Sequence, residues 1–162
     1  MSPKKTNQKS PRERALRLLT VRDRFVAELE GRLRREGFSE DEVADTIAWL
    51  RGLGYLDDRK TAQMWVQHRN RFRITGNLGL RYELSTKGAE DSVINEVLNS
   101  RDAERELAVK AAQRKLQLLS ERDDVLRRRQ KLLQFLQRRG FTWDVAAAAA
   151  DETLGDSLDS DP

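Results

Sequence analysis

The chain of 162 residues contains no cysteine, one histidine and only three prolines. The missing cysteines exclude disulfide frameworks, thiolate metal sites and cysteine nucleophiles. The prolines stand at positions 3, 11 and 162, so almost the whole chain is free of the strongest helix breaker. No apolar run approaches the length of a membrane span, and the N-terminus lacks the apolar region of a signal peptide. These absences predict a soluble, intracellular, all-α protein.

Hydrophobic residues are also scarce, at 38% of the chain, while 36% of the residues are charged. Such a composition builds only small cores, which neighbouring units must support. The charge is uneven, because residues 1–14 carry five bases and one acid, whereas residues 151–162 carry five acids and no base. We expect a disordered basic tail at 1–12 and a disordered acidic tail at 155–162. The alternative is a basic arm that touches nucleic acid and an acidic arm that resists it.

A Leu-x-x-x-Leu-x-x-x-Gly pattern occurs three times, at Leu29–Gly37, Leu80–Gly88 and Leu132–Gly140, with 51 and 52 residues between the glycines. In each copy the leucines share one helix face, and glycine follows where a left-handed C-terminal cap forms. A fixed period near 50 residues indicates one supersecondary unit used in series. A stacked array offers an extended surface for a partner rather than a pocket. The sequence therefore predicts three three-helix repeats, at 13–54, 55–100 and 101–154.

Local signals place several helix boundaries within these repeats. Ser39 and Glu42 have the spacing of a capping box, in which the serine oxygen accepts the Glu42 amide and the glutamate reaches back. One aspartate of the pair Asp57 and Asp58 is expected to cap the following helix. A flexible loop is expected over Ile74–Gly79, because two glycines three residues apart interrupt a helix.

Residues that could carry catalysis are few. The adjacent carboxylates of Asp57 and Asp58 could hold magnesium or act as acid and base, but helix capping explains them more simply. His68 has no serine or acid at a defined spacing that would complete a triad. The Gly76-x-x-Gly79 segment is not followed by the lysine and serine or threonine of a phosphate-binding loop. We therefore predict a non-enzymatic protein without a cofactor or a metal site.

Basic side chains gather in the second and third repeats. Arginine binds phosphates or carboxylates with two hydrogen bonds at once, so these clusters favour an acidic or polyanionic partner. The alternative is an ordinary solvated helix surface. The candidate partner-binding residues are Arg69, Arg71, Arg73, Arg81, Lys87, Arg127, Arg128, Lys131, Arg138 and Arg139.

The segments Gly54–Asp58, Trp65–Arg69 and Leu84–Gly88, with Gly76 between them, resemble the central signature of the RecX regulatory proteins. The resemblance extends over about residues 13–150. It implies three tandem three-helix repeats in an elongated, curved array. It also implies a bacterial cytoplasmic regulator that binds the RecA recombinase filament, with contact to single-stranded DNA weak or indirect. Such proteins usually inhibit the recombinase, ATPase and coprotease activities of RecA.

The chain departs from the family pattern at two positions. Phe25 stands where the family usually has a helix-capping serine, and Ala89 stands where a larger apolar side chain is usual. Both changes predict weaker local packing. A direct DNA-binding protein remains the alternative function, because three-helix units resemble helix-turn-helix architecture. A monomer is the expected state for a repeat array of this size.

Overall fold

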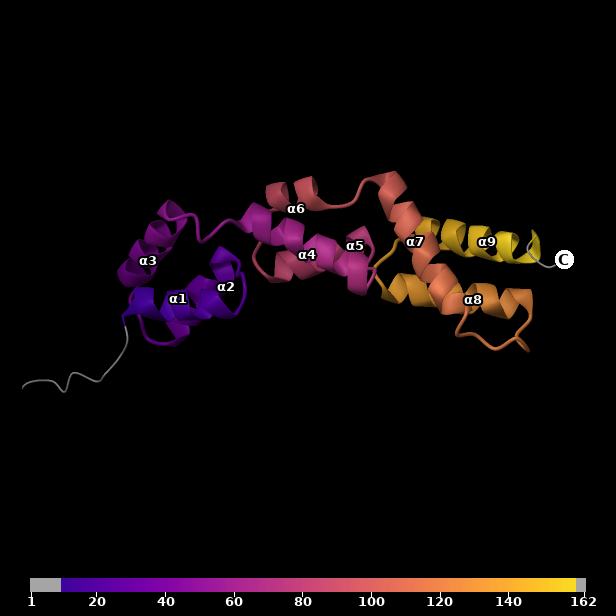
Figure 1. The fold of residues 1–162 in the computed structure, drawn as a ribbon, viewed down its shortest axis with the longest axis horizontal. Helices are drawn as coiled ribbons and strands as arrows, with labels where there is room; N and C mark the ends of the chain where they lie inside the picture. The colour runs from indigo at the N-terminus through magenta and orange to yellow at the C-terminus, as the bar shows by residue number, and fades with distance from the viewer. Residues whose placement is uncertain (1–9, 160–162) are drawn as a thin grey trace, which may run out of the picture.

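The computed structural model describes residues 10–159, with side chains through residue 155, and this part of the chain contains nine helices and no strand (Figure 1). The helices form three three-helix repeats in an elongated, curved array, which confirms the predicted fold class. The predicted repeat boundaries after residues 54 and 100 both fall between helices and stay proposals. The helices are α1 (Pro11–Val21), α2 (Val26–Arg35), α3 (Glu40–Gly52), α4 (Asp58–Phe72), α5 (Asn77–Thr86), α6 (Asp91–Val97), α7 (Arg101–Leu116), α8 (Val125–Arg138) and α9 (Trp143–Asp159).

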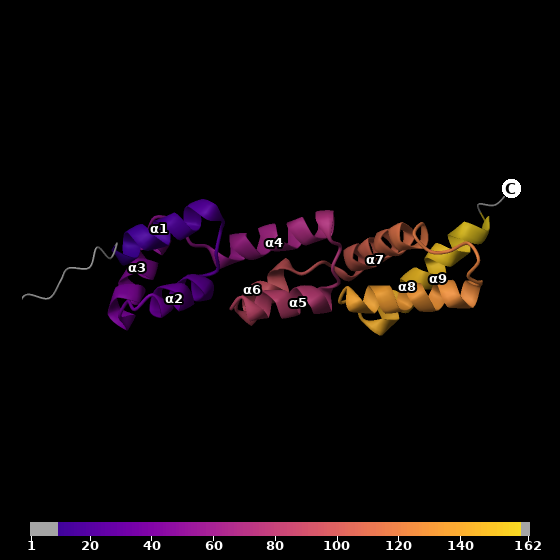
Figure 2. The same ribbon diagram turned by 90° about the horizontal axis from the view of Figure 1, so that it is seen from below.

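The leucine–glycine pattern belongs to the middle helix of each repeat. Its leucines are fully buried in all three copies. The glycines after α2, α5 and α8 have positive φ angles, between 81° and 92°, as the predicted left-handed caps require. Figure 2 shows these three middle helices in one row along the array, with α1, α4 and α7 in a second row. The repeat of the sequence is therefore a repeat of helix placement.

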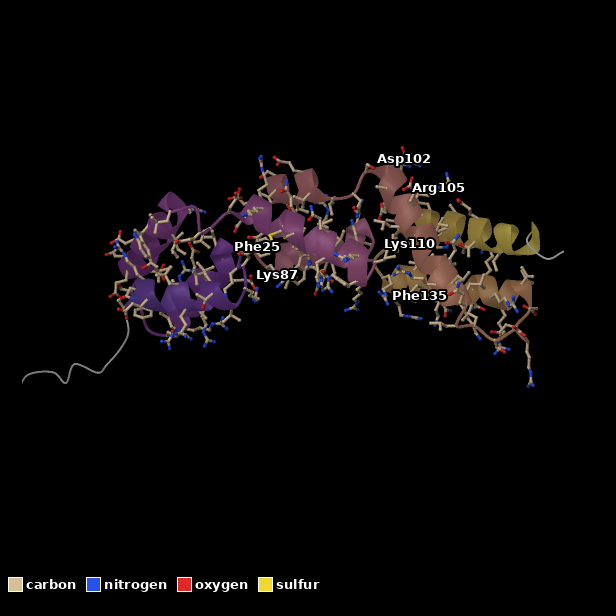
Figure 3. The ribbon with its side chains drawn as sticks, viewed as in Figure 1. Phe25, Lys87, Asp102, Arg105, Lys110 and Phe135 are labelled. Atoms are coloured by element: carbon tan, nitrogen blue, oxygen red, sulfur yellow. The ribbon has the colours of Figure 1, made fainter. Side chains whose placement is uncertain are left out.

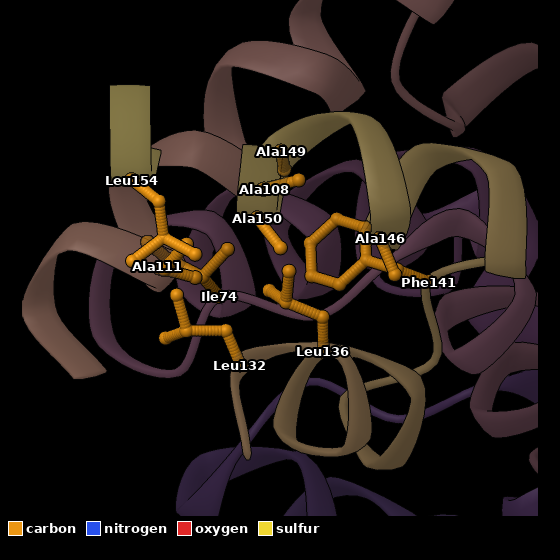
Figure 4. Close-up of a cluster of buried hydrophobic side chains, with 11 residues drawn as sticks. Ile74, Ala108, Ala111, Leu132, Leu136, Phe141, Ala146, Ala149, Ala150 and Leu154 are labelled. Carbon is orange, nitrogen blue, oxygen red and sulfur yellow. The ribbon is translucent and has the colours of Figure 1, made fainter. Parts of the chain in front are cut away.

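Each repeat has its own hydrophobic core, and a large side chain from the preceding repeat completes two of them. Phe25, between α1 and α2, is 1% exposed and packs with Leu80, Leu84 and Ile94 of the second repeat. Ile74, between α4 and α5, is 3% exposed and belongs to the core of the third repeat (Figure 4). The expectation that Phe25 weakens local packing is therefore wrong, because its ring fills the core of the following repeat.

A carboxylate from the following repeat also caps the middle helices α2 and α5. The Val26 amide, first in α2, donates to Oδ1 of Asp58 at 2.9 Å. The Asn77 amide, first in α5, donates to Oε1 of Glu104 at 2.7 Å. The first amides of a helix have no partner within the helix, so a side-chain acceptor oxygen is favourable there. Phe25 itself cannot cap α2, and Asp58 supplies the missing acceptor.

The glycine segment before α5 is a close packing contact rather than the predicted flexible loop. The amides of Gly76 and Gly79 donate to the carbonyl oxygens of Arg139 and Gly140, at 2.8 and 3.1 Å. A Cβ at Gly76 would overlap the Gly140 carbonyl oxygen, and one at Gly140 would overlap the Gly79 backbone. The glycines are thus needed because two backbones meet, and Gly79 lies inside α5 without interrupting it.

Residues 11–12 and 155–159, within the ranges predicted as tails, are helical. Helix α1 already begins at Pro11, because proline is favoured at the first helical position and Ser10 caps the Glu13 amide at 3.2 Å. Helix α9 continues through Asp159, beyond the buried side chain of Leu154 that anchors its last turns on the core of the third repeat. The remaining tail residues, 1–9 and 160–162, lie outside the described residues.

Replacement of Gly140 by alanine tests the backbone contact between α5 and α8. Gly37 is a matched control, because it has the same kind of positive φ but nothing within 4 Å of an added Cβ. We expect Gly37→Ala to lower the free energy of unfolding by about 1–2 kcal/mol, through backbone strain alone. Gly140→Ala should cost at least twice as much in urea denaturation, since its Cβ also separates α5 from α8. Equal losses in the two variants would contradict the close contact.

Candidate partner-binding surface

The acidic pair Asp57 and Asp58 is used for helix capping. Oδ1 of Asp57 accepts the Lys60 amide at 3.1 Å and so caps α4, as predicted. Asp58 instead caps α2 of the preceding repeat. Partial burial raises the pKa of Asp58, with the Val26 amide opposing the shift. Within residues 10–155, no three histidine or acidic side chains converge as metal ligands do.

Two of the ten predicted basic residues surround the ring of Trp65 in the second repeat, and each pairs with a glutamate. Nε of Arg69 lies 2.8 Å from Oε2 of Glu83, and its guanidinium covers the ring of Trp65. The Lys87 ammonium lies 4.4 Å from the centre of the same ring and 3.4 Å from Oε1 of Glu28 in α2. Both side chains are about one-fifth exposed. Arg69 and Lys87 therefore stabilise the fold, and each has a carboxylate partner within it. Lys87 lies where the first and second repeats meet (Figure 3).

Four more of the predicted residues have partners on their own repeat. Arg81 donates to Oδ1 of Asn95 at 2.6 Å. At the start of α8, Arg127 and Lys131 both pair with Asp123, whose pKa they hold below its ordinary value. Arg128 donates to the Glu121 carbonyl oxygen at 2.9 Å. These contacts hold the segment before α8 in place, so the cluster at 127–131 is separate from the cations at the end of the same helix.

The remaining four predicted residues, Arg71, Arg73, Arg138 and Arg139, lie at the junction between the second and third repeats. Arg71 and Arg73 belong to the end of α4, whereas Arg138 and Arg139 belong to the end of α8. No carboxylate of the described part of the chain lies within ion-pair distance of any of them. Arg73, Arg138 and Arg139 line one hollow of about 200 Å³ together with Glu83, whose carboxylate pairs with Arg69. The structure thus joins cations that are 65 residues apart in the sequence into one positive surface.

Several guanidinium groups lie close together at this junction. Burial lowers the pKa of Arg139, and the nearby guanidiniums of Arg73 and Arg69 lower it further. Its guanidinium lies 5.0 Å from the centre of the Phe135 ring, which holds it at the surface of the junction. Because the guanidinium stays charged at any physiological pH, the crowding is relieved best by an anion from outside.

Sequence reasoning missed two cations of the same junction. Arg114 and Lys115, near the end of α7, line a second hollow of about 330 Å³ together with Arg73 and Arg139. They stand in an otherwise ordinary charged helix, and no local motif marks them. A search for basic residues in the last turn of α7, the helix that packs beside α8, would have found them. We call Arg73, Arg114, Lys115 and Arg139 the junction cations.

Comparison with known proteins identifies the family. Models of the first, second and third three-helix domains of RecX match residues 12–50, 57–98 and 102–149. The chain belongs to the RecX family. It is 37% identical to the regulatory protein RecX of Chlorobaculum tepidum over 144 residues, which cover 89% of this chain and 88% of that protein. It is also 37% identical to the RecX of Mycobacterium avium over 150 residues, or 89% and 87% of the two chains.

Solved RecX structures have the same architecture. The crystal structure of RecX from Lactobacillus salivarius superposes with a TM-score of 0.78 at 25% identity, covering 88% of this chain and 94% of that one. Another RecX crystal structure gives 0.75 at 26% identity, covering 87% and 71%. The family's curated members are named as regulatory proteins. Among the described residues, no helix is long and apolar enough to cross a membrane.

The capping role of Asp58 is tested by two substitutions. Asp58→Ala removes the acceptor of the Val26 amide and should cost about 0.5–2 kcal/mol of stability. Asp58→Asn keeps an acceptor oxygen without the charge, so it should be at least as stable as the native chain at pH 7.

The pH dependence of urea unfolding separates the two effects. A raised pKa means that the folded state binds the proton more tightly than the unfolded state. The stability that Asp58 contributes is therefore greatest at acid pH and is lost as the pH rises through the raised folded-state pKa. The native chain should lose stability relative to Asp58→Asn over that range. A difference that is constant with pH would contradict the burial of this carboxylate.

Proposed function

We propose that this chain is a cytoplasmic, non-catalytic regulator that binds the RecA filament and restrains its ATPase, recombinase and coprotease activities in recombinational DNA repair and the SOS response. The observation that carries the proposal is the match of all three repeats to the RecX domains, in order and over most of the chain. The partner is the RecA filament, and the protein binds it as a monomer. Single-stranded DNA is reached only as part of the filament.

The shape and charge of the array support this function. An elongated row of repeats can contact several subunits of a helical filament at once, which gives high avidity without a deep pocket. The junction between the second and third repeats contributes cations that have no carboxylate partner on the described part of the chain, Arg71, Arg73, Arg138 and Arg139. Arg69 and Lys87 are not part of the proposed contact surface, because both are neutralised within the fold.

The proposal is tested by titrating the chain into RecA that hydrolyses ATP on single-stranded DNA. We expect the rate of hydrolysis to fall as the chain is added. Reversal of Arg71 and Arg73 to glutamate should raise the concentration for half-inhibition by about tenfold or more, since buried or bidentate charge pairs contribute that much to binding. Arg17→Glu with Arg35→Glu, which makes the same change of charge on exposed residues of the first repeat, is the matched control.

Three results would contradict the proposal. The native chain could leave the hydrolysis rate and filament length unchanged although it is folded. The control variant could lose as much inhibition as the Arg71 and Arg73 variant, which would indicate a general effect of charge. Tight binding to naked DNA, with a steep dependence on salt, would favour the alternative of a direct DNA-binding protein.

A further inference from the structure

The hollow of about 330 Å³ at the second junction combines positive charge with an apolar floor. The junction cations line it together with Ile74, Ala111 and Leu118. Leu118 is 79% exposed although it is a large aliphatic side chain. Arg73, Arg114, Lys115 and Arg139 have no carboxylate within ion-pair distance in the described part of the chain. The hollow therefore offers charge and apolar surface together to a ligand from outside.

At the first junction, the lysine at the end of α5 has a glutamate partner in the preceding repeat. Counted back from the cap glycines, Lys87 of α5 corresponds to Arg139 of α8. Lys87 pairs with Glu28, and the position that corresponds to Glu28 one repeat later is Gly79. The second junction therefore has no carboxylate at the position from which Glu28 pairs with Lys87 in the first.

A second acid is lost in the same way. Glu83 accepts hydrogen bonds from Nε of Arg69 and from Nε1 of Trp65, both at 2.8 Å. The corresponding position one repeat later is Phe135, which cannot neutralise a cation with a carboxylate. The two junctions share their backbone plan, but the glutamates that pair with Lys87 and Arg69 have no counterpart at the corresponding positions of the third repeat's contacts. This difference is specific to charge, because both cores are completed by a buried apolar side chain.

The rings at the second junction argue against a nucleic acid. Single-stranded nucleic acid binds where bases stack on open aromatic faces. Phe135 is covered by the Lys115 ammonium at 5.6 Å and by the Arg139 guanidinium at 5.0 Å, measured to the ring centre. Phe72 carries the Arg71 guanidinium at 5.2 Å. Phe72 is 63% exposed, so the hollow offers one open aromatic ring beside the exposed aliphatic side chain of Leu118, and not the successive rings on which a strand of bases stacks.

We propose that this hollow is a docking site for an acidic peptide segment that carries a bulky aliphatic side chain. The carboxylates of the segment bind Arg73, Arg114 and Arg139, and the aliphatic side chain packs on Leu118. Guanidinium groups bind carboxylates with paired, charge-assisted hydrogen bonds, so the geometry favours such a partner. The inference rests on the proposed function in that the segment would belong to the filament protein.

The test uses a short fluorescein-labelled oligoglutamate peptide with one central leucine, and fluorescence anisotropy of its complex with the full chain. The same peptide with serine in place of leucine measures the apolar part of binding. An oligothymidylate of equal charge measures binding of nucleic acid. We expect the leucine peptide to bind more tightly than the other two probes.

Three variants locate the binding site. Arg114→Glu should weaken binding of the leucine peptide by about tenfold or more. Lys110→Glu is the matched control, one turn earlier on α7, exposed, and bordering a different hollow with Asp102 and Arg105 (Figure 3). It should change the affinity by less than about twofold. Leu118→Ser should abolish the preference for leucine over serine without loss of helicity, because its side chain is exposed.

The inference is overturned if no probe binds, if serine and leucine peptides bind equally, or if Lys110→Glu weakens binding as much as Arg114→Glu. Tighter binding of oligothymidylate than of the leucine peptide would show a nucleic-acid site instead. The assay contains no RecA, so the two proposals fail separately. A chain that inhibits RecA but ignores the peptide overturns the docking site alone, and a chain that binds the peptide but leaves RecA unaffected overturns the proposed function alone.

Discussion

The hydrogen bond between the first amide of a middle helix and a carboxylate of the next repeat is the constraint on which the rest of the array depends. Asp58 fulfils this role for Val26, and Glu104 for Asn77. An isolated three-helix unit of this composition has a small core and a free helix N-terminus. Because the acceptor comes from the following repeat, neither unit is complete without its neighbour. The side chains of Phe25 and Ile74 cross the same junctions and pack in the core of the following repeat, so hydrophobic contacts also join neighbouring repeats.

The same plan leaves room for function to differ between junctions. Glu28 pairs with Lys87 across the first junction, and Glu83 pairs with Arg69 inside the second repeat, so both cations around Trp65 have a counter-charge. At the second junction, the corresponding positions hold Gly79 and Phe135, and the positive charge stays unpaired. Gly79 also allows the backbone of α8 to approach α5. One change of residue therefore brings two backbones together and removes a counter-charge, which couples the packing of the junction to its proposed binding role.

Features that depend on short spacings could be predicted from the sequence. Contacts between segments that are far apart in the chain could not. The helices, the buried leucines and the left-handed glycine caps follow from local periodicity, and they are confirmed. That Phe25 and Asp58 act in a neighbouring repeat could not be predicted, because their partners are set by the stacking of repeats. Adjacency in the sequence likewise predicts the wrong grouping of basic residues. Ion pairs occupy some members of each run, and the fold adds Arg114 and Lys115 to the second junction.

Amide hydrogen exchange of Val26, Gly76, Asn77 and Gly79 tests the dependence between repeats most directly. First-turn amides of an ordinary helix exchange rapidly, because they have no partner within the helix. Here each donates across a junction, so all four should be protected to the level of the core amides around Leu80 and Leu84. Exchange of these four amides at the rate of free helix ends, with the leucine amides still protected, would contradict the account.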